Sequence, residues 1–264
     1  MAEPQARHRE LWFDFWGATT RVVVPTEDDQ RHLTYYFQDY ITAPAESAHV
    51  HVLLSAGENE AYMTAPVARR SVVVQTSDGR RSRLQGEQTV STPTPLPPFT
   101  LEPLNLTLTT IHAAAATHPQ SPEEAVVIHG PSTAGKSCLV SALVQQGWGF
   151  LSDDTVPIDR DGRALPFSRP VGIRERAAAR SGIDRDQYGG ALVFETRLGA
   201  TLSVHPRDLG WPIAEPARIR WVVALQPSNS FAVETLSPHH VRITLDIERH
   251  EGDAVATIEE LCHA

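Results

Sequence analysis

The chain has 264 residues, of which 41% are hydrophobic and 21% charged, and its formal net charge at pH 7 is −9. This length is enough for one large domain or two smaller ones, each with a buried core. The negative charge argues against broad electrostatic binding to nucleic acid or to anionic lipid. The two cysteines, Cys138 and Cys262, are too few for a disulfide framework or a four-cysteine metal site.

The sequence carries no signal for export or membrane insertion. The stretch MAEPQARHRELWFDFWGATT has no apolar segment of signal-peptide length. No run of about 18 apolar residues, the length needed to span a bilayer as a helix, occurs in the chain. We therefore expect a cytoplasmic protein without membrane or nucleic-acid partners, and a homo-oligomer is compatible with the composition.

The first part of the chain is rich in strand-forming patterns. Aromatic and β-branched residues alternate with polar ones, and turn residues separate the runs. One segment differs, because its apolar residues recur at helical spacing behind Thr26, a good N-terminal helix cap. The predicted strands lie in 11–24, 48–56 and 69–85, and the predicted helix in 26–41.

A proline-rich stretch, STPTPLPPF at residues 91–99, separates this part from the rest. Proline fixes φ and donates no backbone hydrogen bond, so such a stretch is typical of a stiff connector. We place a domain boundary there, with a β-rich N-terminal domain over 1–98 and a second domain over 99–264.

The second part begins with a strand, a glycine-rich loop, a helix that ends at Gly147 and another strand. A unit of this kind indicates a parallel α/β core with a helical crossover. The strands are predicted at 124–130 and 148–158 and the helix at 136–147. Further strands are predicted at 189–196, 200–206, 218–226 and 240–247, and a last helix at 252–264.

The loop GPSTAGKS matches the pattern G-x-x-x-x-G-K-[ST]. Glycines let the backbone curl around an anion, and the following helix N-terminus turns its N–H groups toward it. Lys136 would reach the β- and γ-phosphates of ATP, and the Ser137 hydroxyl would bind Mg²⁺. The residues expected to hold the nucleotide are Gly130, Pro131, Ser132, Thr133, Ala134, Gly135, Lys136, Ser137 and Cys138.

An aspartate pair, Asp153 and Asp154, follows the strand after the loop helix. A P-loop kinase needs a carboxylate near its metal ion and a base for the acceptor proton, and two adjacent carboxylates could divide these tasks. The alternative interpretation is an ordinary acidic turn after a strand, and it would be favoured if the P-loop were absent. Taken with the loop, the pair favours catalysis over a nucleotide switch, because a switch needs no base for a hydroxyl.

Other candidates are weaker on pattern alone. His112 lies in TTIHAAAATH, and a lone histidine is more often structural than catalytic. Phosphoryl transfer often uses an arginine, and Arg169, in the proline-bounded loop FSRP, ranks ahead of Arg174 and Arg197.

The segment from IHAAAA through VVIHGPSTAGKSCLVSALVQQGWGFLSDDTVPI resembles the HPr kinase/phosphorylase superfamily, in particular its smaller HPr kinase-like members. The resemblance covers about residues 108–175. The family has a histidine on a strand, a hairpin, a P-loop, a helix that ends in glycine and an Asp-Asp pair. Asp153 and Asp154 stand 17 and 18 residues after Lys136, as in that family.

This resemblance implies a fold like that of phosphoenolpyruvate carboxykinase, with the P-loop in a mixed sheet. It implies that Asp154 is the general base toward a serine hydroxyl, and that Asp153 supports the metal and the base. It also implies that His112 lies near the phosphates. The glycine-rich signature linked to phosphorolysis in the bacterial regulator has only a faint counterpart in LPFSRPVGIRERAAARSG. Neither HPr itself nor phosphorolysis is therefore expected.

The sequence thus predicts an ATP-dependent kinase that phosphorylates a hydroxyl. The leading acceptor is a serine of a peptide or protein, as with the precursor-peptide kinases of lasso peptide clusters that this chain resembles. A small-molecule alcohol kinase and a non-catalytic nucleotide-binding module stay open as alternatives.

Overall fold

The computed structural model describes residues 9–57, 60–63, 65, 67–85, 101–174, 192–196 and 199–263. The chain divides into two compact units. The first unit comprises Met1–Thr107 with Val193–Thr201, and the second unit Leu108–Leu192 with Leu202–Ala264. The proline-rich connector at 91–99 and the predicted boundary after residue 98 lie outside the described residues.

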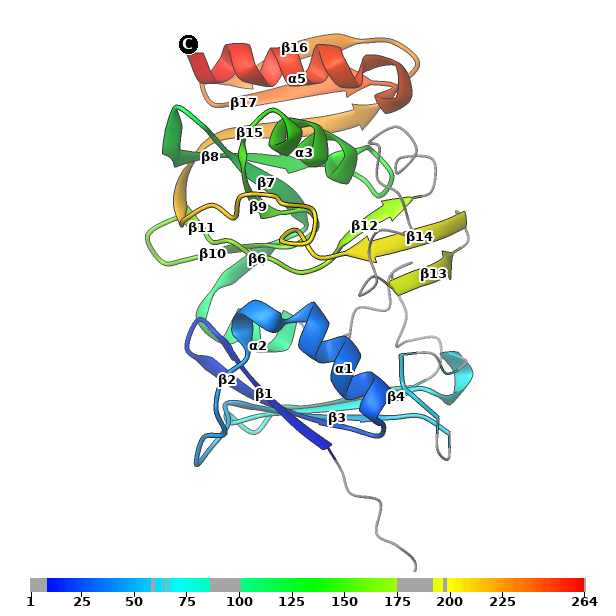
Figure 1. Cartoon of the computed structure of the whole chain (residues 1–264). Coiled ribbons are helices and arrows are strands. Elements are labelled where there is room, and N and C mark those ends of the chain that lie inside the picture. Colours follow the sequence, from blue (N-terminus) through cyan, green and yellow to red (C-terminus); the bar gives the residue numbers. More distant parts are fainter. Residues whose placement is uncertain are drawn as a thin grey trace, which may run out of the picture. The chain divides into compact units, whose positions relative to one another are not determined.

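The described strands of the first unit's main sheet follow chain order, β1-β2-β3-β4-β5 (Figure 1). All neighbours are antiparallel except β2 and β3, which are parallel and joined through a helix. The three predicted segments are confirmed, two of them as hairpins. The strands are β1 Arg9–Phe15, β2 Ala18–Val24, β3 Val50–Ser55, β4 Ser71–Thr76 and β5 Arg81–Gln85.

Helix α1 (Glu27–Tyr36) covers one face of this sheet (Figure 1). Its predicted cap is confirmed, because the Thr26 hydroxyl accepts a hydrogen bond from the Asp29 amide at 3.2 Å. The helix is shorter than predicted. It ends at Tyr36, because the φ of −121° at the next residue, Phe37, departs from helical values, and the chain continues as a 3₁₀ turn, η1 (Gln38–Tyr40).

Aromatic rings form the core beneath this helix. Phe37 contacts Phe13 and Phe15 edge-on, with ring centroids 5.3 Å apart in both pairs. These three side chains are fully buried. Rings of this size contribute much of the burial that stabilises a small sheet domain.

The larger sheet of the second unit has the order β6-β10-β11-β15-β8-β7-β9, and β17 and β16 extend it from β15 (Figure 1). Strands β8, β15 and β17 are parallel neighbours, whereas β7 is antiparallel to both β8 and β9. The predicted parallel arrangement holds for β8, β15 and β17, but the strand after the loop helix does not pair with the strand before it. The sheet is therefore mixed, as the family resemblance implied. Strands β8 and β9 run in the same direction with β7 between them.

The strands of this sheet are β6 Thr109–Ile111, β7 Ala113–His118, β8 Ser121–His129, β9 Gly149–Ser152, β10 Val156–Ile158, β11 Arg163–Ala164, β15 Ala217–Pro227, β16 Ala232–Ser237 and β17 His240–Leu245. A separate sheet has the order β12-β14-β13, from β12 Val171–Arg174, β13 Leu192–Thr196 and β14 Gly199–Val204.

Two helices of the second unit, α3 (Lys136–Gln145) and α5 (Ile247–His263), pack against each other. Gly147, with φ of 94°, follows α3 in the left-handed conformation expected of a helix-ending glycine. Helix α5 begins five residues before the predicted start at 252, because a kink at His250 joins an extra turn to it.

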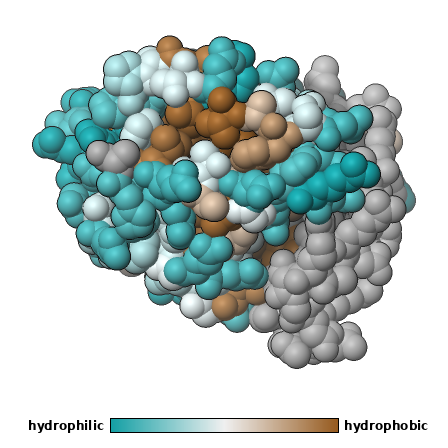
Figure 2. Space-filling model, turned by 90° about the horizontal axis from the view of Figure 1, so that it is seen from above, coloured by the Kyte–Doolittle hydropathy of each residue, from teal (hydrophilic) through white to brown (hydrophobic). Residues whose placement is uncertain are grey.

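Several elements were not predicted, among them a helix and a strand at the edge of the larger sheet. Helix α2 (Leu101–Thr107) follows the connector region, and β16 forms the outer edge beside β17. Every residue of β16 is exposed, including Val233 and Leu236 at 45% and 37%. Figure 2 shows apolar side chains gathered on the face that carries α5 and β16 in Figure 1. An exposed strand has no alternation of buried and polar residues, so the usual strand signal is missing.

None of the helices in the described part of the chain is both long and apolar enough to cross a membrane.

Candidate active site

The predicted phosphate loop joins β8 to α3, and its backbone has a positive φ at three residues. Gly130, Thr133 and Gly135 all have positive φ, at 153°, 71° and 98°. A side chain at either glycine would clash, because an added Cβ would lie 2.6 Å from the Leu225 carbonyl oxygen at Gly130 and 2.4 Å from Ile247 Cγ1 at Gly135. Both glycines are therefore needed for conformation and for space.

Lys136, the first residue of α3, lies folded over this loop. Its Nζ donates hydrogen bonds to the carbonyl oxygens of Gly130 at 2.9 Å and Pro131 at 3.2 Å. Burial lowers the pKa of Lys136, although the charges of Asp154 and Asp153 act in the opposite direction. The amino group is thus electrostatically coupled to both aspartates.

The aspartates lie at a bend between two strands, so the single strand predicted over 148–158 is wrong. Strand β9 ends at Ser152 and β10 begins at Val156. A backbone on the edge of a sheet can change direction where its ladder of hydrogen bonds is interrupted, and here the chain leaves β7 to pair with β6.

His112 lies at a second bend, between β6 and β7. The family resemblance implied that this histidine is on a strand, and that expectation is wrong. The Ala113 amide donates to the Asp154 carbonyl at 3.1 Å, which joins the two bends. The strand pairing explains why these residues meet. Strand β6 pairs with β10 and β7 pairs with β9, and His112 and Asp154 lie between these two paired regions. The flanking pairs are Ile111 with Val156 and Ala115 with Ser152.

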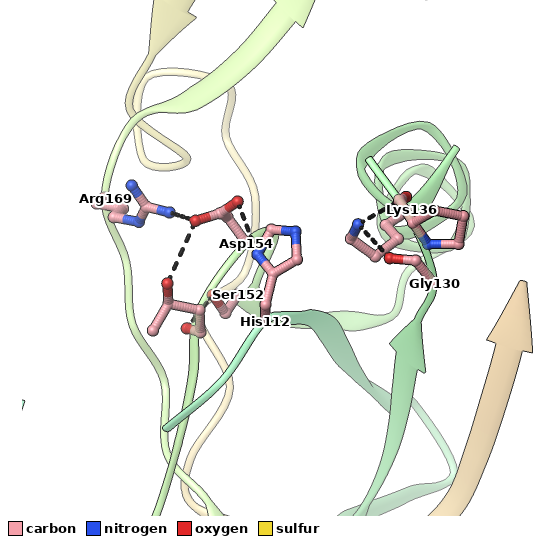
Figure 3. Close-up of polar contacts among 8 residues, drawn as sticks. His112, Gly130, Lys136, Ser152, Asp154 and Arg169 are labelled. Atoms are coloured by element: carbon pink, nitrogen blue, oxygen red, sulfur yellow. Dashed lines mark hydrogen bonds and ion pairs between the residues drawn. The ribbon is translucent and has the colours of Figure 1, made fainter. Parts of the chain in front are cut away.

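The Asp154 carboxylate is held by three side chains (Figure 3). Its Oδ2 accepts from Arg169 Nη2 at 2.5 Å and from the Thr155 hydroxyl at 3.2 Å, and its Oδ1 lies 3.3 Å from His112 Nδ1. Burial alone would raise the pKa of Asp154. The charges of Arg169 and His112, with these hydrogen bonds, outweigh burial and lower the pKa below its ordinary value. The carboxylate is therefore kept ionised.

Asp153 has the opposite environment although it is the next residue. Only 7% of it is exposed, and burial raises its pKa to about 6, opposed by the charge of Arg169 and reinforced by that of Asp154. Two neighbouring carboxylates with pKa values pushed apart are a common arrangement in enzyme active sites.

Arg169 belongs to the loop between β11 and β12, and its side chain is 3% exposed. Its guanidinium lies over the Phe167 ring at 5.7 Å, and its Nε is buried without a hydrogen-bond partner among the described residues. His205, which was not predicted, holds this loop. Its Nε2–H donates to the Ser168 carbonyl at 3.2 Å, while its Nδ1 accepts from the Arg207 amide at 3.3 Å.

The structure thus brings together His112, Asp154 and Arg169, which are far apart in sequence. Figure 3 shows them on one side and Lys136 with the predicted phosphate loop on the other, and in this view the His112 ring lies between Asp154 and Lys136. Ser137 and Cys138 follow Lys136 on α3. Arg174 ends β12, and Arg197 lies outside the described residues.

The predicted metal ligands can be tested against this geometry. In the described ranges, no three His, Cys, Asp or Glu side chains form a cluster that could hold a metal ion. Mg²⁺, however, takes few protein ligands, because nucleotide phosphates and water complete its shell. Burial disfavours the charged form of Asp153, and a bound cation would offset that cost. The other predicted ligand, Ser137, is the second residue of α3.

Comparison with known proteins adds little to this geometry. No family model matches the chain, and no curated protein matches it either. Among solved structures, the HPr(Ser) kinase/phosphatase from Coxiella burnetii is similar at a TM-score of 0.32 and 16% identity, over 59% of this chain and 94% of that one. A likeness with this TM-score does not by itself establish a shared fold.

Proposed function

We propose that the protein is an ATP-dependent kinase that transfers the γ-phosphate to a hydroxyl group, with a serine of a peptide or protein as the leading acceptor. The observation that carries this proposal is the Asp154 carboxylate, which stays charged through Arg169 and whose charge acts on Lys136 of the predicted phosphate loop. A nucleotide switch needs no base for an acceptor hydroxyl, whereas a kinase needs one close to the phosphate site.

The proposed reaction begins with the triphosphate held by the loop amides and by Lys136, whose amino group exchanges its carbonyl partners for phosphate oxygens. Asp154 takes the proton of the acceptor hydroxyl as that oxygen forms its bond to the γ-phosphorus. The bond from the γ-phosphorus to the bridging oxygen breaks, and ADP leaves with the electron pair. Mg²⁺ held by Ser137 and Asp153 would add positive charge beside the β- and γ-phosphates.

The proton that Asp154 takes up has a route to solvent. His112 Nδ1 lies 3.3 Å from Asp154 Oδ1, and the His112 side chain is 58% exposed. An imidazole can release a proton to solvent from one nitrogen and take up a proton on the other. Arg169 serves a different purpose, because its buried charge keeps the carboxylate ionised between turnovers.

A small-molecule alcohol is the second candidate acceptor, because Arg169 places a buried positive charge beside the proposed base. Such a charge would suit an anionic substrate. Salt distinguishes the two classes: a peptide bound by backbone pairing and apolar pockets keeps its affinity as ionic strength rises, whereas a small anion loses it.

The test is to incubate the protein with ATP and candidate acceptors and to analyse the acceptors by mass spectrometry. The candidates are peptides encoded by neighbouring genes and small alcohols made by the products of those genes. A gain of one phosphate on a serine supports the leading proposal, and a gain on a small alcohol supports the second. ATP binding without any transfer to either class, over a concentration range that saturates the nucleotide site, would leave only a non-catalytic binding module.

A further inference from the structure

A groove of about 410 Å³ opens beside the phosphate loop, on the side away from Asp154. Strands β15 and β17 lie on one side of β8, and β7 and β9, which lead to His112 and Asp154, lie on the other. The groove is built at the carboxyl ends of three parallel strands, where ligands of α/β proteins collect. It is lined by Thr133, Ala134, Pro227, Ser228, Asn229, Leu245, Asp246 and Ile247.

The groove is held in a fixed position relative to the phosphate loop. Ile247, on its wall, lies so close to Gly135 that an added Cβ would be 2.4 Å from Cγ1. The other wall is tied in by the Ser228 amide, which donates to the Leu245 carbonyl at 2.8 Å. A ligand that spans the loop and the groove would therefore meet a preformed surface, which reduces the entropy lost on binding.

We propose that this groove receives the nucleoside of the bound nucleotide, and that Asp246 selects ribonucleotides through the ribose hydroxyls. The inference rests on the proposed function in one respect, that the loop holds the phosphates. If the γ-phosphate faces Asp154, the nucleoside end must leave the loop on the opposite side, where the groove begins at Thr133 and Ala134. Apolar walls at Pro227 and Ile247 suit the faces of a base.

Asp246 has an acceptor to offer a ribose. Its Oδ1 caps α5 by accepting from the Glu248 amide at 3.0 Å. Its Oδ2 forms an ion pair with Arg249 Nε at 3.6 Å, which is longer than a hydrogen bond, and the Arg249 and Asp246 side chains are 74% and 28% exposed. A carboxylate oxygen is a strong acceptor for hydroxyl donors, so Oδ2 can bind a ribose hydroxyl while Oδ1 keeps the cap.

The test uses ADP and 2′,3′-dideoxy-ADP as probes, with binding measured by calorimetry. The wild-type protein should bind ADP about tenfold more tightly than the dideoxy analogue. Asp246→Asn keeps a capping oxygen but replaces the second oxygen with an NH₂ group, so the preference should fall to within about threefold. Asp246→Ser, which also provides a good cap, should lose the preference for ADP to the same extent. Asp253 is an exposed aspartate on the same helix, so the control variant Asp253→Asn should keep the tenfold preference for ADP.

Tripolyphosphate, which has no nucleoside, separates the groove from the loop. Its affinity should be the same in the wild type and in Asp246→Asn. An Asp246→Asn protein that keeps a tenfold preference for ADP would overturn the proposal, as would a wild type with no preference. Absence of phosphate transfer with an intact ribose preference would instead reject the kinase function and leave the groove assignment standing.

Discussion

Asp154→Asn separates the proposed catalytic role of this residue from its structural one. The amide has nearly the same shape as the carboxylate, but it cannot accept the proton of a hydroxyl. We expect transfer to fall by about 10²-fold or more, with ATP affinity changed by less than about threefold. Nucleotide binding should survive because the loop and Lys136 are untouched.

The stability of the variant follows from the ion pair. Arg169 is 3% exposed and bonds to Asp154 at 2.5 Å, and removing one partner of a buried pair typically costs about 3–5 kcal/mol. The Asp154 side chain is 34% exposed, and Asp153 still interacts with the guanidinium, so about half of that cost is expected here, roughly 1.5–2.5 kcal/mol. The melting temperature should fall by roughly 3–10 °C.

The assay combines calorimetry with ATP, thermal unfolding and mass spectrometry of the acceptor, all at a temperature well below the variant's melting point. Asp161→Asn is the matched control, because its side chain is 80% exposed in the same unit. Transfer by Asp154→Asn at the wild-type rate would refute the assignment of the base. A melting temperature equal to that of the wild type would refute the structural importance of the pair with Arg169.

The other predictions concern the loop and the first unit. Lys136→Ala should abolish measurable ATP affinity in calorimetry, because it removes the cation above the loop, and undiminished affinity would reject the P-loop interpretation. Gly135→Ala should lower the urea midpoint more than Gly147→Ala; both have positive φ, but only the former would meet Ile247. Equal midpoints would show that strain at φ alone, about 1–2 kcal/mol, accounts for both. Asp29→Asn should cost about 1–3 kcal/mol in urea unfolding, because the fully buried carboxylate accepts two backbone hydrogen bonds at 2.9 Å and an amide can accept only one of them; an unchanged midpoint would contradict this.

Local patterns in the sequence were enough to predict the strand and the helix on either side of the loop at 130–135. The strand before Gly130, the helix from Lys136 and the left-handed Gly147 depend on backbone preferences and on hydrogen bonds over a few residues. The Thr26 cap and the hairpins of the first unit are of the same kind. In each case the determining residues lie within one or two turns of one another.

The order of strands in the second unit could not be derived in this way. A run such as 148–158 has the composition of one strand, and only its pairing first with β7 and then with β6 divides it at the aspartates. Likewise, β16 is exposed along its whole length, so its place at the edge beside β17 leaves no periodic signal. Pairing partners depend on the whole sheet and on the packing of its two faces.

The sequence by itself was enough to propose which residues bind phosphate and take up a proton, because the loop pattern and the aspartate pair are local. Only the tertiary structure decided that Arg169 holds Asp154 and that Asp246 lies on a groove beside the loop. These side chains are brought together by loops that leave different strands, at distances along the chain over which local preference has no influence. The burial that separates the pKa values of Asp153 and Asp154 arises in the same way, because it depends on what the rest of the sheet packs around them.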